Sequence, residues 1–182
     1  MLATEFLHGQ GLGNQLFCYV TTRMLAHRHG YDFGIKGLKS AGDSRVNQKG
    51  FYFMDLDYGK EVPDDLERYD EYRHALKTDE WLRTDIRLTD KTLLNIPDNR
   101  IIYGNMQSED YFYDRLDLVK EWLKVREEYD HMDTNDKNLC VLNFRGGDMI
   151  GNPGAYVPRK YWTNAMQKML EYNPNMKFCI VT

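Results

Sequence analysis

The feature that most constrains the fold is a glycine-rich segment, residues 9–15 (GQGLGNQ), that follows a short apolar run. That run, residues 3–8 (ATEFLH), predicts a strand leading directly into the glycines. Apolar side chains then recur at helical spacing and predict a helix over about 14–29, with Gly30 placed to end it. Residues 32–36 predict a second strand. This order indicates an α/β fold with a parallel sheet flanked by helices.

The middle of the chain is less regular. Residues 37–98 are rich in turn formers and charges, and we expect an irregular excursion holding one or two helices. Residues 100–104 (RIIYG) predict a strand, and Ser108 predicts the N-cap of a helix after it. The acidic and polar residues 127–138 predict a linker.

A second unit follows this linker. Residues 139–144 (LCVLNF) and 177–181 (KFCIV) are nearly all apolar, as in strands buried on both faces, and residues 159–172 predict a helix between them. We therefore expect a first domain over residues 1–136 and the beginning of a second over 137–182. Because two strands and one helix enclose little core, we expect the second domain to be incomplete.

Composition limits the partners. The formal net charge of −4 offers no general attraction for nucleic acid or anionic membranes, which bind basic faces. Cys18, Cys140 and Cys179 lack metal-ligand spacing, and the odd count favours reduced, buried thiols. These residues contain no signal-peptide pattern and no apolar run long enough for a transmembrane segment. We expect a cytoplasmic protein that binds no nucleic acid, with peripheral membrane association left open.

The glycine-rich turn is the first candidate for chemistry. Gly11 and Gly13 let the backbone turn tightly and approach a ligand, and free N–H groups at a helix start attract phosphate or carboxylate. Asn14 stands where a dinucleotide fingerprint requires its third glycine, and no Gly-Lys-Ser/Thr follows, as a P-loop requires. Chemistry alone leaves a structural turn and an anion site as equal alternatives.

The second candidate is an RGGD segment at the end of the predicted strand 139–144. The planar guanidinium of Arg145 suits two phosphate oxygens, and Gly146 and Gly147 let a ligand come close. Asp148 can orient the arginine or meet a ligand hydroxyl. Ligands bind open α/β sheets at the carboxyl ends of strands. The alternative is a turn with a local Arg145–Asp148 pair.

Other positions have simpler alternatives. Asp55 and Asp57 match a DxD pair that holds a divalent metal in many nucleotide-sugar enzymes, although such carboxylates are usually only solvated. Gln107 lies at a strand-to-helix junction without a capping duty, which places it at the same crevice. His8 ends the first strand, where a structural histidine is the alternative. No Ser-His-Asp or Cys-His arrangement supports nucleophilic hydrolysis.

Three segments together resemble one family. Residues 11–17 (GLGNQLF) look like the N-terminal signature of the α-1,2-fucosyltransferases, and residues 104–112 (GNMQSEDYF) are similar to the family's G-x-x-Q-S-x-x-Y-F segment. Residues 143–148 (NFRGGD) resemble its H-x-R-R-G-D motif, with Asn143 in place of the histidine and Gly146 in place of the second arginine. The three segments have the family's order and spread over most of the chain.

The resemblance implies an inverting glycosyltransferase of GT-B architecture, in which two Rossmann-like domains face a cleft and no metal cofactor is used. It implies GDP-fucose as donor and a glycan acceptor, with the 2-OH of a galactoside as the expected position. The residues it places at the donor phosphates are Gly11, Gly13, Asn14, Arg145, Gly146 and Gly147. On the acceptor side it places His8, Gln15 and Gln107. The expected catalytic residues are Arg145, Asn14 and Asp148, with Asp148 as a candidate general base.

Two alternatives stay open. One is a non-catalytic nucleotide- or sugar-binding module on the same scaffold, and the other is a metal-dependent glycosyltransferase that uses Asp55 and Asp57. In the family, guanine-binding residues lie past the equivalent of Thr182. We therefore expect these 182 residues alone to bind GDP-fucose weakly and to be inactive.

Overall fold

The computed structural model describes a chain that divides into two compact units, Met1–Asp130 and His131–Thr182. The described residues are 1–6, 10–37, 53–71, 89–130, 135–144 and 157–181. The sequence placed the domain boundary nearby, between residues 136 and 137. Among the helices of the described residues, none has the length and apolar character needed to cross a membrane.

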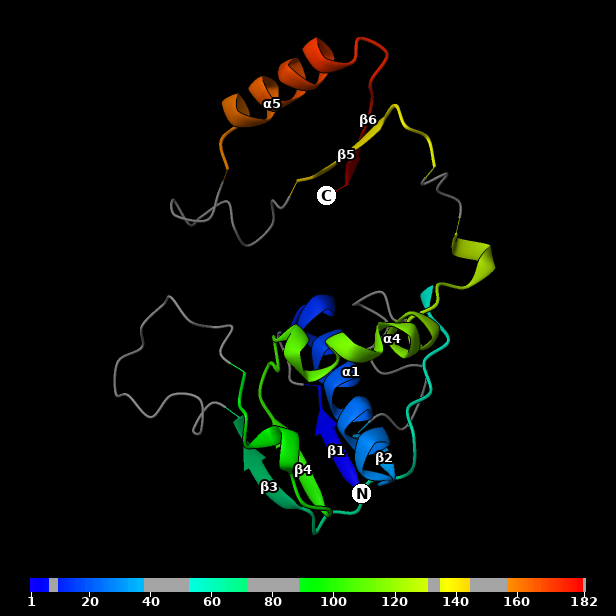
Figure 1. The fold of residues 1–182 in the computed structure, drawn as a ribbon, viewed down its shortest axis with the longest axis vertical. Coiled ribbons are helices and arrows are strands. Elements are labelled where there is room, and N and C mark those ends of the chain that lie inside the picture. Colours follow the sequence, from blue (N-terminus) through cyan, green and yellow to red (C-terminus); the bar gives the residue numbers. More distant parts are fainter. Residues whose placement is uncertain (7–9, 38–52, 72–88, 131–134, 145–156, 182) are drawn as a thin grey trace, which may run out of the picture. The chain divides into compact units, whose positions relative to one another are not determined.

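The first unit is built on a four-stranded sheet in the order β2-β1-β4-β3 (Figure 1). Its strands are β1 (Leu2–Glu5), β2 (Phe33–Lys36), β3 (Glu67–Asp70) and β4 (Arg100–Tyr103). Every neighbouring pair is parallel, and Leu2 aligns with Phe33 on one side and with Arg100 on the other. The predicted α/β class with a parallel sheet is therefore confirmed.

Helix α1 (Leu12–His29) connects β1 to β2 and packs on both strands. It ends where the sequence predicted, because Gly30 adopts a left-handed φ of 69° and its N–H bonds to the last carbonyls of the helix. The side chains of α1 that are almost fully buried include Cys18, Tyr19, Val20, Met24 and Leu25. They meet apolar side chains of β1 and β4 in one hydrophobic core, which fixes α1 against the sheet.

Strand β3 is the element that the sequence pattern missed, since we expected irregular structure over this part of the chain. Its sequence, ERYD, is polar and none of it is fully buried. The physical reason is its position at the edge of the sheet, where a strand needs no apolar run. The side chain of Glu67 pairs with Arg100 of β4 at 2.9 Å, so charge pairing supports this edge.

The single helix expected after Ser108 is interrupted. Two 3₁₀ turns, η3 (Glu109–Tyr111) and η4 (Tyr113–Arg115), precede helix α4 (Leu116–Trp122). The predicted cap is confirmed, because the Ser108 hydroxyl accepts the Asp110 N–H at 3.3 Å. Helix α4 lies beside α1 (Figure 1). Two further 3₁₀ turns are η2 (Leu93–Asn95) and η5 (Glu127–Tyr129).

The second unit has a strand–helix–strand order. Strands β5 (Leu139–Asn143) and β6 (Lys177–Val181) pair in parallel, and helix α5 (Arg159–Tyr172) lies between them in sequence. The partly buried residues of α5 recur at helical spacing, whereas those around them are exposed. These partly buried residues are Trp162, Ala165, Met166, Met169 and Leu170.

Two expectations for this unit were wrong. The strands are not buried on both faces, because Val141 is 47% exposed and Ile180 is 61% exposed. One helix cannot cover both faces of a two-stranded sheet, so apolar residues stay accessible within the unit. All three thiols are free, but only Cys18 is buried, while Cys140 and Cys179 are half-buried.

Candidate functional site

The glycine-rich turn forms the start of α1. Gly11 is the N-cap, with φ −73° and ψ 162°; no side chain of the described residues caps the helix, and its first turn holds no acidic residue. Among the described residues, apart from chain neighbours and the helix's own backbone, no atom lies within 4 Å of a Cβ placed at Gly11 or Gly13, and neither residue has a positive φ. Neither packing nor backbone conformation therefore requires glycine at these positions. Close approach of a ligand to the helix N-terminus is one physical reason that fits glycine here.

The segment after β4 meets this turn through two hydrogen bonds. Gln107 Nε2 donates to Asn14 Oδ1 at 2.5 Å, and Gln10 Nε2 donates to Asn105 Oδ1 at 3.1 Å. Strands β1 and β4 are parallel neighbours, so the residues that follow each of them reach the same edge of the sheet. The structure thus brings together Asn14 and Gln107, which the sequence assigned to one crevice from separate motifs.

A buried carboxylate holds the loop that carries Asn105 and Gln107. Glu71 is only 6% exposed; its Oε2 accepts the Met106 N–H at 2.7 Å and its Oε1 accepts the Tyr111 O–H at 3.0 Å. Burial raises the pKa of Glu71, although these hydrogen bonds act in the opposite direction.

The backbone of this loop is held in an unusual conformation. Met106 has a left-handed φ of 47°, which a non-glycine residue keeps only where its surroundings impose it. Gly104 is required for a different reason, because a Cβ there would lie 2.3 Å from Glu71 Oε2. The carboxylate of Glu71 therefore fixes both the shape of the loop and the residue that the loop begins with.

The buried network extends from Glu71 to a second carboxylate. The Tyr111 hydroxyl accepts the Asp90 N–H at 2.7 Å, and the Tyr69 O–H donates to Asp90 Oδ2 at 2.6 Å. Burial is the main cause that raises the pKa of Tyr111, and the negative charge of Glu71 raises it further. Burial also raises the pKa of Tyr69. Both hydroxyls therefore stay protonated at neutral pH and donate to the carboxylates, which suits a structural support.

Two buried side chains near the start of α1 have no direct access to a ligand. Gln15, predicted on the acceptor side, is fully buried, and neither polar atom of its amide has a hydrogen-bond partner among the described residues. Cys18 donates to the Gly104 carbonyl at 3.2 Å. Burial, supported by the negative charge of Glu71, raises the pKa of Cys18 to about 12, so the thiol is protonated and is no nucleophile.

The remaining predicted site residues lie outside the described residues. They are His8, Arg145, Gly146, Gly147 and Asp148. The structure gives only what precedes the RGGD segment, namely a parallel strand, β5, that ends at Asn143.

Asp55 and Asp57 form ion pairs with two different arginines. Asp55 pairs with Arg126 at 3.4 Å, and Asp57 pairs with Arg23 at 3.2 Å while it also accepts the Gly59 N–H at 2.9 Å. Over the described ranges, His, Cys, Asp and Glu side chains form no group of three or more that could hold a metal ion.

Sequence reasoning missed three residues of the site: Gln10, Asn105 and Glu71. The first two lie inside or beside the motifs, and polar amides flanking both motifs were the available signal. Nothing in the sequence marked Glu71, because it lies in the part of the chain without a regular pattern. The loop that it holds by a hydrogen bond to Met106 is distant in sequence.

Comparisons with known proteins add no relative. The chain matches no protein-family model, and neither the curated proteins nor the solved structures contain a significant match. The family resemblance therefore rests on the three sequence segments alone.

Proposed function

We propose that this chain belongs to an enzyme that transfers L-fucose from GDP-fucose to a sugar hydroxyl, with the 2-OH of a galactoside as the first acceptor to test. The transfer inverts the reacting sugar carbon and needs no metal ion. In this proposal the first unit is one Rossmann-like half of a GT-B enzyme and the second unit belongs to the donor half.

The observation that carries the proposal is the hydrogen bond between Gln107 and Asn14. These residues come from the two motifs of the first unit that resemble the family, and they lie far apart in the sequence. The parallel order of β1 and β4 brings the two segments to the same edge of the sheet, and the hydrogen bond turns their amide groups toward each other there. Polar groups that converge in this way fit a shared site for one ligand.

The chemistry follows from the charge that develops on the leaving group. As the bond to fucose breaks, GDP gains negative charge, which donors already in place stabilise. The N–H groups at the start of α1, approached closely at Gly11 and Gly13, supply part of this stabilisation. The guanidinium of Arg145 supplies the rest, because its planar fork binds two phosphate oxygens.

The amide side chains have a positioning role. Asn14 and Gln107 are neutral, so they orient a ligand by hydrogen bonds and add no charge. Taking the proton from the acceptor hydroxyl requires a general base, and Asp148 is the candidate in this sequence.

The experiment is a transfer assay with the full-length protein. Radiolabelled GDP-fucose is incubated with phenyl β-galactoside, and the neutral labelled product is counted, with GDP-mannose and UDP-galactose as control donors. Label transferred from GDP-fucose alone supports the proposal. Tight, saturable binding of GDP-fucose without any product would assign the chain to the non-catalytic binding modules instead.

A further inference from the structure

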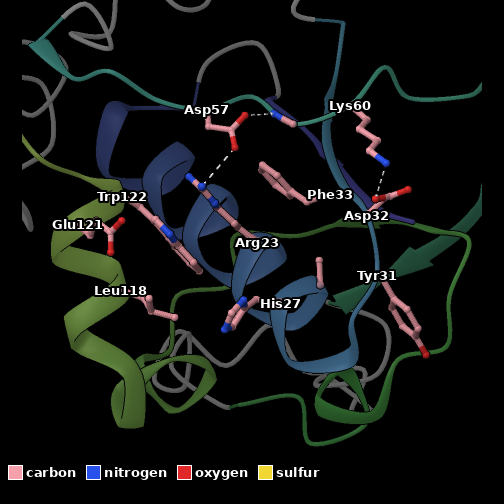
Figure 2. A pocket seen from close by; sticks show the side chains of 12 residues that line it. Arg23, His27, Tyr31, Asp32, Phe33, Asp57, Lys60, Leu118, Glu121 and Trp122 are labelled. Atoms are coloured by element: carbon pink, nitrogen blue, oxygen red, sulfur yellow. Dashed lines mark hydrogen bonds and ion pairs between the residues drawn. The ribbon is translucent and has the colours of Figure 1, made fainter.

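A cavity of about 340 Å³ lies in the first unit between α1, α4 and the start of β2 (Figure 2). Arg23 and His27 from the second half of α1 line it on one side, Trp122 and Glu121 from α4 on another, and Phe33 at the start of β2 on a third. At a rise of about 1.5 Å per residue, Arg23 lies about 14 Å along α1 from Asn14, and His27 about 20 Å. The cavity is therefore separate from the candidate site at the start of α1.

The guanidinium of Arg23 is the most firmly held charged group of the lining. Arg23 lies over the Trp122 ring at 4.5 Å and over the Phe33 ring at 6.0 Å, between the two aromatic side chains in Figure 2. Its Nη2 pairs with Asp57 Oδ2 at 3.2 Å, and its Nη1 donates to the Tyr19 hydroxyl. Stacking and ion pairing together hold Arg23 in one orientation, so its remaining N–H groups are donors in fixed positions.

The charges of the lining exclude several ligand classes. The lining contains two cations and three carboxylates, so its formal charge is −1 when His27 is counted as neutral. The cations are Arg23 and Lys60, and the carboxylates are Asp32, Asp57 and Glu121. Lys60 is engaged by Asp32 at 2.8 Å. An anion finds no net attraction here, and a cation is repelled by the Arg23 guanidinium. A purely apolar ligand would bury charged groups without replacing their hydrogen bonds to water.

We propose that this cavity binds one neutral sugar ring, which makes it a second carbohydrate site on the first unit. A sugar ring combines apolar C–H faces with hydroxyl groups that donate and accept. The C–H groups contact Leu118 and the parts of the Trp122 and Phe33 rings that Arg23 leaves uncovered. The hydroxyls donate to Glu121 and accept from Arg23. The volume is at the lower end of the range for ligand pockets, which suits a single ring, either free or at the end of a glycan.

The test is saturation-transfer NMR on the whole chain with galactose, glucose, fucose and N-acetylglucosamine, together with an array of neutral glycans. Binding on the monosaccharide arm shows that a free ring is sufficient, and binding on the array alone assigns the site to glycan ends. We expect Glu121→Gln to weaken binding roughly fivefold, because a hydrogen bond to a carboxylate is stronger than one to an amide. Trp122→Ala should abolish it.

Matched controls separate this cavity from the candidate site. Tyr113→Ala removes an aromatic ring of the same unit that is 68% exposed and does not line the cavity, so binding should not change. Asn14→Ala alters the candidate site and should leave the part of the binding that depends on Glu121 unchanged. Trp122 packs against the hydrophobic core, so its replacement by alanine can unfold the unit. Glu121 is exposed, and the binding measured with Glu121→Gln then decides the test.

Three results would overturn the proposal. The first is the absence of binding by any neutral sugar on both arms. The second is sugar binding that Asn14→Ala abolishes and Glu121→Gln leaves intact, because the sugar then occupies the candidate site. The third is binding of inorganic phosphate or tetramethylammonium, sensitive to Glu121→Gln, where no neutral sugar binds. Failure of the transfer assay alone leaves this proposal standing, since the cavity needs no GDP-fucose.

Discussion

Replacing Glu71 by leucine removes the buried carboxylate that holds the loop after β4. Two buried donors lose their acceptor, the Met106 N–H at 2.7 Å and the Tyr111 O–H at 3.0 Å. Each buried donor left unpaired costs about 1–3 kcal/mol, which gives about 2–6 kcal/mol for the pair before any relief. Removal of a charge that is itself disfavoured by burial offsets part of this cost. We expect Glu71→Leu to lower the free energy of unfolding by about 2–4 kcal/mol at pH 5.

The effect depends on pH in a defined direction. Because burial raises the pKa of Glu71 above its ordinary value of 4.5, the folded unit holds this proton more tightly than the unfolded chain does. The stability contributed by the protonated carboxyl is present below pH 4.5 and is lost as pH rises through the folded-state pKa. The stability difference between wild type and Glu71→Leu should therefore shrink as pH rises.

Glu71→Gln is the matched control, because glutamine has the same size and resembles the protonated carboxyl. We expect Gln to lie within about 1 kcal/mol of wild type at pH 5, since it keeps one acceptor oxygen. As pH rises, Gln should gain stability relative to wild type, because it never acquires the buried charge.

The assay is urea unfolding followed by far-UV circular dichroism at several pH values above 5, with hydrogen exchange of the Met106 amide as a local probe. That amide should exchange faster in Glu71→Leu, because its acceptor is gone. Equal stability of the leucine variant and wild type at every pH would refute the supporting role of Glu71. A difference that grows with rising pH would show that the folded-state pKa is lowered.

Three further predictions concern the proposed transfer. Arg145→Lys should abolish turnover, because a point charge replaces the bidentate fork; turnover within about threefold of wild type in the labelled-fucose assay contradicts this. Transfer should persist in excess EDTA. Loss of activity that manganese restores would instead favour a metal-dependent enzyme that uses Asp55 and Asp57. Gly13→Ala should leave the fold unchanged or stabilise it by up to about 1 kcal/mol, since its Cβ meets open space, and yet reduce turnover. Unchanged kcat/KM with a raised unfolding midpoint would remove the role of Gly13 in ligand approach.

Local signals predicted the first part of the fold. The glycine-rich turn, the helix over about 14–29 and the stop at Gly30 each depend on a short stretch of sequence, and each was found. Strand β3 was missed because an edge strand can be polar, and its pairing partner β4 lies far along the chain. The interrupted helix after Ser108 was missed because its apolar spacing is also compatible with two 3₁₀ turns before α4.

For the candidate site, too, some residues were predictable from local motifs and others depended on the tertiary fold. Asn14 and Gln107 were predictable from their motifs, and the order of strands in the sheet then decides that they meet. The burial of Gln15 was not predictable, because a polar residue one position after Asn14 gives no sign of facing the core. Glu71 was beyond sequence reasoning, since its importance arises from a loop that folds back onto it.

A double-mutant cycle on Asn14 and Gln107 tests the central claim that the two motifs form one fucosyl-transfer site. The quantity measured is kcat/KM for transfer from GDP-fucose by wild type, Asn14→Ala, Gln107→Ala and the double variant. Because the two side chains share a hydrogen bond of 2.5 Å, we expect a coupling energy of about 0.5–3 kcal/mol, with the double variant no more than roughly threefold below the worse single variant. Losses that simply multiply, or single variants that both keep wild-type turnover, would contradict a shared site.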